Sequence, residues 1–405
     1  MQKRFTPDAG GVFPEWEEKT LGECMTLIAS KGYKGKDLVS DESKAIMFSP
    51  SDIDTFGAVS LVKNAHISDE LFQKSKEALV KNGDILFTKT ASIGKVGYVK
   101  NLDHNATINP QIVILRANED IDSYLLFCAV KTEAFKKQVR KISGGTTIKT
   151  MSQETLKELK IKIPKSMEEQ RKIAAALAAY DEMIAVKNAK LETWQECKKR
   201  MVKEIFGRTK RFRDDDGNEF PEWEEKTLGE VAEINPASAE SLPETFYYMD
   251  LGSIDSGIWT EKRLVDKKSA PSRAQRIAQQ DDVFFQSVRP LNKDHYHYTK
   301  KADKSVVAST GFIQLRIKNG SNAFLYQLLY ENNFNNEVKR YTTGSNYPAI
   351  NTTSLSKIKI MVPCMAEQQK IGSFLAEIDK EIEIQKEFIK TYAEGKKRMM
   401  RELIR

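Results

Sequence analysis

Two long segments of the chain carry apolar residues in steps that alternate between four and three, which is the spacing of helices with a heptad seam. We expect one helix over residues 165–207 and another over 364–405. Their starts match, because Met167–Ile173 reads MEEQRKI and Met365–Ile371 reads MAEQQKI. The predicted seam residues are Ile173, Leu177, Ile184, Leu191 and Trp194 in the first helix and Ile371, Leu375, Ile382, Ile389 and Tyr392 in the second.

Polar residues interrupt both seams at equivalent positions, Lys187 with Gln385 and Lys198 with Lys396. Polar seam residues commonly fix the register and the choice of partner. A coiled coil that joins two chains would also explain an isolated seam. Because the two helices share the same interruptions, we instead predict that they pack on each other within one chain.

The segments that precede the helices contain short β-rich runs bounded by Gly, Asn, Asp and Pro, as expected for strands. Residues 83–90 align with 281–288, and residues 106–116 align with 306–316. Helical stretches follow at 123–141 and 323–340. Each segment closes with a short apolar strand that ends in proline, Leu159–Pro164 and Ile358–Pro363. We predict two α+β globules, each with a curved antiparallel sheet.

The chain is a tandem duplication. Residues 13–23 and 220–230 both read FPEWEEKTLGE, at an offset of 220 − 13 = 207. KKRMVKEIF at 198–206 recurs as KKRMMRELI at 396–404, at an offset of 396 − 198 = 198. The predicted organisation is therefore a first domain (1–164), a first helix (165–207), a linker with the second domain (208–363) and a second helix (364–405).

Composition supports ordinary folded cores, since 40% of the 405 residues are hydrophobic and 30% are charged. No run of about 18 apolar residues predicts a membrane span, and no apolar stretch follows the basic start. We therefore expect a cytoplasmic protein. The four cysteines are scattered and read as reduced thiols. His295 and His297 have no further ligand nearby in sequence, so we predict solvent-facing or DNA-facing imidazoles and no metal site.

The net charge of +7 is modest, but basic residues cluster at 198–213 and over residues 396–405. Such clusters attract phosphate groups. Cations also suit the negative end of a helix dipole, so the clusters alone leave both interpretations open.

No catalytic motif is present in the sequence. It lacks GxxxxGK[ST], HExxH and GxSxG, and INPQ at 108–111 and INPA at 234–237 lack the second proline and the aromatic residue of an amino-methyltransferase NPPY-type motif. We expect a chain that is not itself an enzyme.

The chain does carry loops rich in Lys, Arg, Ser, Thr, Asn and Tyr, which suit hydrogen bonds to base edges and phosphates. Equivalent loops of the two copies differ in sequence, as expected of modules that read different DNA sequences, although unconstrained loops would drift in the same way. The predicted DNA-binding residues are Lys31, Tyr33, Lys34, Lys36, Thr88, Lys89, Thr90, Ser92, Lys95, Thr146, Thr147 and Lys149 in the first copy and Gln286, Ser287, Arg289, Asn292, Lys293, His295, Tyr296, His297, Thr343, Ser345, Asn346 and Tyr347 in the second.

With its duplicated WEEKTLGE, the GDILFTKT strand, the EEQRKI and EQQKI helix starts and the KKRM helix ends, the chain resembles the specificity subunit of a type I restriction-modification enzyme. The resemblance covers nearly the whole chain. It implies two target-recognition domains separated by two helices packed as an antiparallel coiled coil, in a pseudo-twofold arrangement. Each domain would read half of an asymmetric, interrupted site in double-stranded DNA, and the helices would set the unread spacer.

The resemblance also implies partners. Two modification subunits would transfer a methyl group from S-adenosylmethionine to adenine, and restriction subunits would add ATP- and Mg-dependent translocation and cleavage. The chain itself would bind no cofactor. The competing interpretations are a standalone two-module DNA-binding regulator, a coiled-coil adaptor without a DNA role and a self-contained methyltransferase, the last disfavoured by the missing motifs.

Overall fold

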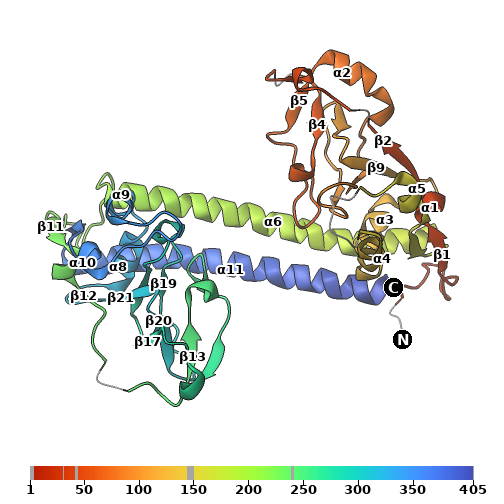
Figure 1. The fold of residues 1–405 in the computed structure, drawn as a ribbon. Helices are drawn as coiled ribbons and strands as arrows, with labels where there is room; N and C mark the ends of the chain where they lie inside the picture. Colours follow the sequence, from red (N-terminus) through yellow and green to blue (C-terminus); the bar gives the residue numbers. More distant parts are fainter. Residues whose placement is uncertain (1–3, 31, 42–43, 144–149, 239–240, 405) are drawn as a thin grey trace. The chain divides into compact units, whose positions relative to one another are not determined.

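The computed structural model describes residues 4–30, 32–41, 44–143, 150–238 and 241–404 (Figure 1). The chain forms two compact units. Unit 1 comprises Met1–Val186 with Ile389–Arg405, and unit 2 comprises Lys187–Phe388. Each unit holds one α+β domain together with part of each long helix, so neither long helix belongs to a single unit. The predicted fold class, two α+β domains with two long helices, is confirmed.

Unit 1 contains two four-stranded sheets, in the orders β2-β9-β6-β7 and β3-β5-β4-β8, and a two-stranded ribbon of β1 with β10. All pairs are antiparallel except β4 with β8. Its elements are β1 (Glu17–Thr20), α1 (Leu21–Cys24), β2 (Met25–Ala29), β3 (Leu38–Val39), β4 (Ile46–Phe48), β5 (Ala65–Ile67), α2 (Asp69–Lys74), β6 (Ile85–Thr88), β7 (Val96–Tyr98), β8 (Ala106–Ile108), β9 (Ile112–Ala117), α3 (Ser123–Ala129), α4 (Glu133–Ser143), α5 (Gln153–Glu158) and β10 (Lys160–Ile163).

Unit 2 repeats this plan with sheets β12-β21-β18-β19 and β16-β13-β20-β17, the ribbon β11-β22 and one extra hairpin, β14-β15. Its parallel pair is β13 with β20. Its elements are β11 (Glu224–Thr227), α7 (Leu228–Val231), β12 (Ala232–Ile234), β13 (Thr245–Met249), β14 (Ile254–Asp255), β15 (Ile258–Trp259), β16 (Arg263–Asp266), β17 (Ala274–Ile277), β18 (Val283–Gln286), β19 (Tyr296–His297), β20 (Val306–Ser309), β21 (Phe312–Ile317), α8 (Asn322–Leu328), α9 (Asn332–Tyr341), α10 (Thr352–Ser356) and β22 (Lys359–Val362).

The duplicated WEEKTLGE motif forms a strand followed directly by a one-turn helix. Thr20 caps that helix, and its backbone N–H and hydroxyl both donate to Glu23 at 2.7 Å. Thr227 and Glu230 repeat the arrangement in unit 2. In both copies the glutamate carboxylate accepts the N–H of the capping threonine, and in unit 2 the N–H of Glu230 also donates to the Thr227 hydroxyl at 3.4 Å. Such caps satisfy N–H groups at a helix start, which explains the sharp change from strand to helix.

The structure corrects the expectation of one antiparallel sheet per domain. The run 106–116 is two strands, β8 and β9, which belong to different sheets, and 306–316 divides in the same way into β20 and β21. The predicted helical stretches are also each divided in two, α3 with α4 and α8 with α9. Periodicity alone gives no signal for such short breaks.

The long helices are α6 (Met167–Phe206) and α11 (Met365–Leu403). In unit 1, Ile173 and Leu177 of α6 share a core with Leu403 of α11. In unit 2, the other end of α6 packs on the start of α11, with Ile205 and Ile371 in one core. The helices are therefore antiparallel within each unit. Of the predicted seam residues, Ile173, Leu177, Ile184, Ile371 and Leu375 are buried, whereas Leu191, Trp194, Ile382, Ile389 and Tyr392 are half-buried.

Gly372 shows how closely the domain of unit 2 approaches α11. A Cβ atom at this position would lie 2.8 Å from the backbone nitrogen of Phe324 and 2.9 Å from Cβ of Ala323, at the start of α8. Glycine weakens a helix interior by about 1 kcal/mol relative to alanine. The close approach of α8 explains why glycine nevertheless occupies this position.

Candidate nucleic-acid interface

Two predicted loops of unit 2, 286–301 and 342–348, lie against each other. The backbone N–H of Arg289 donates to the carbonyl of Pro348 at 2.6 Å. The Arg289 guanidinium lies 5.1 Å from the ring centroid of Tyr347, whose side chain is 72% exposed. Arg289 and Lys293 both adopt left-handed backbone conformations, with φ of 52° and 62°, so the loop turns tightly. An exposed cation stacked on an exposed ring can contact phosphates or bases.

The equivalent loops of unit 1 meet in the same manner. Thr90 forms a β-bridge with Thr150, as Val288 does with Ala349 in unit 2. The backbone N–H of Lys89 donates to the carbonyl of Gln111 at 2.8 Å. Nearby in sequence, the amide of Asn109 lies 3.4 Å from the hydroxyl of Tyr33. Tyr33 and Lys89 thus both contact the turn at 109–111, and the carbonyl of Lys89 also accepts the N–H of Met151 at 2.9 Å.

The other predicted residues of these loops differ in exposure. Lys95 is tied down, because its ammonium group donates to the carbonyl of Pro50 at 2.8 Å. Lys31, Thr146, Thr147 and Lys149 lie outside the described residues. Exposed predicted residues are Lys34, Lys36, Ser92, Arg289, Asn292, Thr343, Ser345, Asn346 and Tyr347, and half-buried ones are Tyr33, Lys89, Thr90, Lys95, Lys293, Tyr296 and His297.

Four predicted contact residues are buried, and their side chains bond within the domains. Thr88 donates to the carbonyl of Ser92, and the Gln286 side chain accepts from the Asp294 N–H at 2.9 Å. Ser287 donates to the carbonyl of Gly311 at 2.7 Å, and His295 is fully buried. Their prediction as DNA contacts is therefore corrected. A polar residue beside a turn can hydrogen-bond the backbone of that turn instead of DNA, and composition does not distinguish these two uses of the side chain.

His295 and His297 lie in different environments. Nδ1 of His295 accepts the backbone N–H of Gln286 at 3.1 Å, and the ring stacks on Phe285 with centroids 4.6 Å apart. Burial, helped by the charge of Lys293, lowers the pKa of His295 to about 3, so the imidazole is neutral. The expectation of a solvent-facing or DNA-facing imidazole is wrong for His295. His297 instead lies 2.7 Å from a carboxylate oxygen of Asp281. Among the described side chains, no cluster of three or more His, Cys, Asp or Glu could hold a metal ion.

The structure adds basic residues that the sequence analysis did not select. Lys262 lies 5.5 Å from the ring centroid of Trp259, and Arg263 lies 5.2 Å from that of Tyr248. Arg276 has a buried Nε without a hydrogen-bond partner in the described part of the chain, and burial lowers its pKa. Arg263 and Arg276 lie on β16 and β17, the two edge strands of one sheet. The basic run EKRLVDKK at 261–268 is the sequence signal that could have indicated Lys262 and Arg263, but Arg276 lies outside it.

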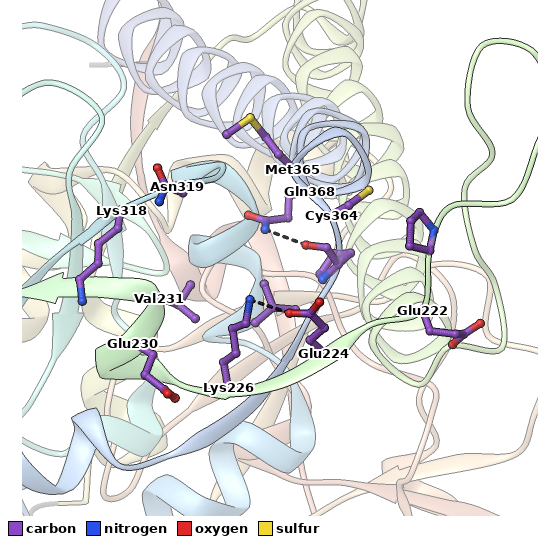
Figure 2. A pocket seen from close by; sticks show the side chains of 13 residues that line it. Glu222, Glu224, Lys226, Glu230, Val231, Lys318, Asn319, Cys364, Met365 and Gln368 are labelled. Carbon is purple, nitrogen blue, oxygen red and sulfur yellow. Dashed lines mark hydrogen bonds and ion pairs between the residues drawn. The ribbon is translucent and has the colours of Figure 1, made fainter.

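Two cavities lie in unit 2, and the second is lined in part by Tyr296, His297 and Lys300 of loop 286–301. Figure 2 shows the first, about 320 Å³, at the start of α11. Among its lining residues, Lys226 pairs with Glu224 at 2.7 Å, and the amide of Gln368 donates to the carbonyl of Pro363 at 2.9 Å. The second, about 420 Å³, lies between β19, α8 and α11. No described helix is both long and apolar enough to cross a membrane.

A family profile described as the type I restriction modification DNA specificity domain matches the chain twice, over residues 14–193 and 221–391. Two similar curated proteins come from Methanocaldococcus jannaschii. The type I restriction enzyme MjaVIII specificity subunit is 24% identical, with 96% of this chain and 92% of that protein covered. The putative MjaX specificity subunit is 24% identical, with 100% and 96% covered. The crystal structure of a type I restriction-modification S subunit from M. genitalium matches with a TM-score of 0.64 and 17% identity, covering 96% of both chains.

Proposed function

The chain belongs to the type I restriction-modification DNA specificity family, and on that premise we propose that each of its two units reads one half of an interrupted, asymmetric DNA site. The chain is then the DNA-binding specificity subunit of a restriction-modification complex. Family membership favours this function over a standalone DNA-binding regulator.

One observation carries the proposal: the two units share a framework but differ in the loops it holds. The bridge of Thr90 with Thr150 and that of Val288 with Ala349 occupy equivalent places. Around them, unit 2 carries the stacked pair of Arg289 and Tyr347, and unit 1 carries Lys89 and Tyr33. A shared framework with different polar side chains in its loops is what two modules with different target sequences require.

The physical advantage of two modules is discrimination. Each wrong base pair costs about 1–3 kcal/mol, so a half-site of a few base pairs separates target from competing DNA only weakly. Two half-sites read by one chain add their discrimination. The long helices would set the unread spacer, and the 40 residues of α6 alone correspond to a length of about 60 Å at 1.5 Å per residue.

We further propose that catalysis lies on partner subunits. Two modification subunits would bind S-adenosylmethionine and methylate adenine at the site that this chain selects. Restriction subunits would use ATP and Mg for translocation and cleavage. This chain would contribute DNA binding and a scaffold.

A base-resolution map of adenine methylation tests the proposal. Cells that express this chain with its modification partner are compared with cells that lack only this chain. We expect one bipartite motif with a single spacer length, and we expect it to disappear without the chain. A motif that persists without the chain would overturn the proposal.

Loop variants give the test a second arm. Exchanging Arg289, Asn346 and Tyr347 of unit 2 for alanine should relax or abolish one half of the motif and leave the other half intact. Alanine at Lys34, Lys36 and Lys89 of unit 1 should affect the opposite half. Loss of both halves from either set would contradict the assignment of one half-site to each unit.

A further inference from the structure

In unit 1, side chains from two other helices contact the carboxylate of Asp181, which lies on α6. The Lys396 ammonium group of α11 lies 2.6 Å from both Asp181 oxygens, and the Tyr124 hydroxyl of α3 donates to the same carboxylate. The Lys396 nitrogen also lies 3.1 Å from the Tyr124 hydroxyl. We name Tyr124, Asp181 and Lys396 the unit 1 clamp. Lys396 is only 7% exposed, so its charge depends on Asp181 for compensation.

Unit 2 contains the same arrangement with the helices exchanged. The Lys198 ammonium group of α6 lies 2.5 Å from Asp379 of α11, and the side-chain amide of Gln327 in α8 donates to the other Asp379 oxygen at 2.7 Å. Lys198 also lies 4.6 Å from the ring centroid of Tyr330. We name Lys198, Gln327 and Asp379 the unit 2 clamp.

The clamps match on their helix side and differ on their domain side. Asp181 and Asp379 are equivalent (379 − 181 = 198), as are Lys198 and Lys396 (396 − 198 = 198). The domain residues are not equivalent. From the N-caps Asp122 and Ser321, the offset between α3 and α8 is 199, so Gln327 corresponds to Cys128 and lies one helical turn beyond the position of Tyr124.

We infer that Asp181 and Asp379 are positioning residues: each fixes its recognition domain and the opposite long helix to one point, and together they determine the spacer length that the chain accepts. This inference rests on the proposed function.

The chemistry of the clamp suits positioning better than stability. The Lys396 side chain is largely buried, and the Lys198–Asp379 pair is partly buried, with side chains 16% and 31% exposed. Ion pairs removed from solvent contribute little net stability, but a charge left without its partner is costly, so they penalise any other register. A shift of either helix by one turn, about 5.4 Å, would separate lysine from carboxylate. Tyr124 in unit 1 and Gln327 in unit 2 bond the domain to the same aspartate carboxylate. A shift of the helix and a shift of the domain would therefore each break a bond to that carboxylate.

The experiment uses the full chain in complex with its modification partner. DNA substrates carry the two half-sites of the wild-type motif with the native spacer or with one base pair more or fewer. Asp379→Asn keeps the size and the acceptor for Gln327 but removes the charge that Lys198 needs. We expect its preference for the native spacer to fall by about tenfold, in line with coupling energies within buried networks, while base preferences within each half-site stay unchanged.

Further variants separate positioning from folding. Glu387→Gln, at an exposed residue of α11, is the matched control and should keep the native spacer preference. Gln327→Met removes only the hydrogen bond between the domain and Asp379, and it should also weaken the preference for the native spacer. The double change Lys198→Asp with Asp379→Lys should restore it in part, because Oε1 of Gln327, buried without a partner in the described residues, can accept from the new lysine.

A wild-type complex that shows no bipartite motif would refute the proposed function itself. If the wild type shows one spacer length and folded Asp379→Asn and Gln327→Met both keep its full preference, the positioning role is overturned and the proposed function stands.

Discussion

The guanidinium of Arg211 donates two hydrogen bonds to the fully buried carboxylate of Glu367, from Nε to Oε1 at 3.3 Å and from Nη2 to Oε2 at 2.9 Å. The indole of Trp223 donates to the same carboxylate at 3.0 Å. This relationship ties the linker that begins unit 2's domain to the first turn of α11. Arg4, Glu169 and Trp16 form the equivalent contacts in unit 1.

Removing the Glu367 charge should destabilise the protein strongly. In Glu367→Gln, Arg211 keeps a partly buried charge without its main partner, and we expect a loss of about 3 kcal/mol in the free energy of unfolding. Urea unfolding measures this loss. Glu222→Gln is the matched control, because Glu222 also pairs with Arg211 at 3.0 Å but is 85% exposed. It should cost at most about 1 kcal/mol. Equal losses in the two variants would contradict the prediction.

The burial of His295 predicts an acid-sensitive unit 2. Its folded pKa of about 3 lies below the ordinary value of 6.5, so the unfolded chain takes up a proton first as the pH falls. The free energy of unfolding should therefore decrease between about pH 6.5 and 3, with this histidine contributing a slope of about 1.4 kcal/mol per pH unit. In His295→Asn, whose side-chain oxygen can still accept from Gln286, that contribution should vanish. The same change at the exposed His104 should leave the slope in place. Unfolding followed at several pH values distinguishes these outcomes.

Arg289→Ala tests whether the stacked pair of unit 2 contacts bases or phosphates. If Arg289 reads a base, target DNA should lose about 1–3 kcal/mol of binding free energy and specificity at one position. If it binds a phosphate, all sequences should weaken alike and the salt slope should fall by about one. Lys390→Ala, at an exposed site on α11, is the control. Binding that is unchanged for target and nontarget DNA would remove Arg289 from the interface.

Gly372→Ala should destabilise the protein although alanine is the better helix former. The new methyl group would overlap the start of α8, and such overpacking costs about 1–3 kcal/mol. The equivalent position of α6 is Ala174 (372 − 198 = 174), which is buried. Ala174→Gly should lose about 1 kcal/mol for the opposite reason, a weaker helix. Thermal unfolding of both variants provides the comparison. A Gly372→Ala variant more stable than the wild type would contradict the prediction, because it would show that α8 accommodates the new methyl group without a loss of stability.

The sequence predicted what depends on short-range periodicity. Residues such as Leu177 and Leu375 repeat at helical spacing, and both are buried in the cores. It could not assign Lys198 and Lys396, which read only as seam interruptions. Their partners, Asp379 and Asp181, are defined by the antiparallel register of two distant segments.

The candidate interface was predicted less completely. The loops around Arg289 and Tyr347 were selected by composition, and the structure brings them together. Composition does not say which polar groups of a loop are used internally. Ser287 and His295 are residue types that suit DNA contacts, but both are buried. Ser287 donates to the backbone carbonyl of Gly311, and His295 accepts the backbone N–H of Gln286. The remaining predicted contacts stay predictions.

The division of the chain into units has a consequence for its synthesis. Unit 2 is a continuous stretch, Lys187–Phe388, whereas unit 1 is not, because Leu403 and Ile404 fill the core around Leu177. A ribosome makes these residues after all of unit 2, although most of unit 1 leaves the tunnel first. The domain translated first therefore completes its core last, and until then an apolar face of α6 is open to chaperones and proteases. Premature termination before residue 399 would leave the domain translated first, not the one translated second, without part of its core.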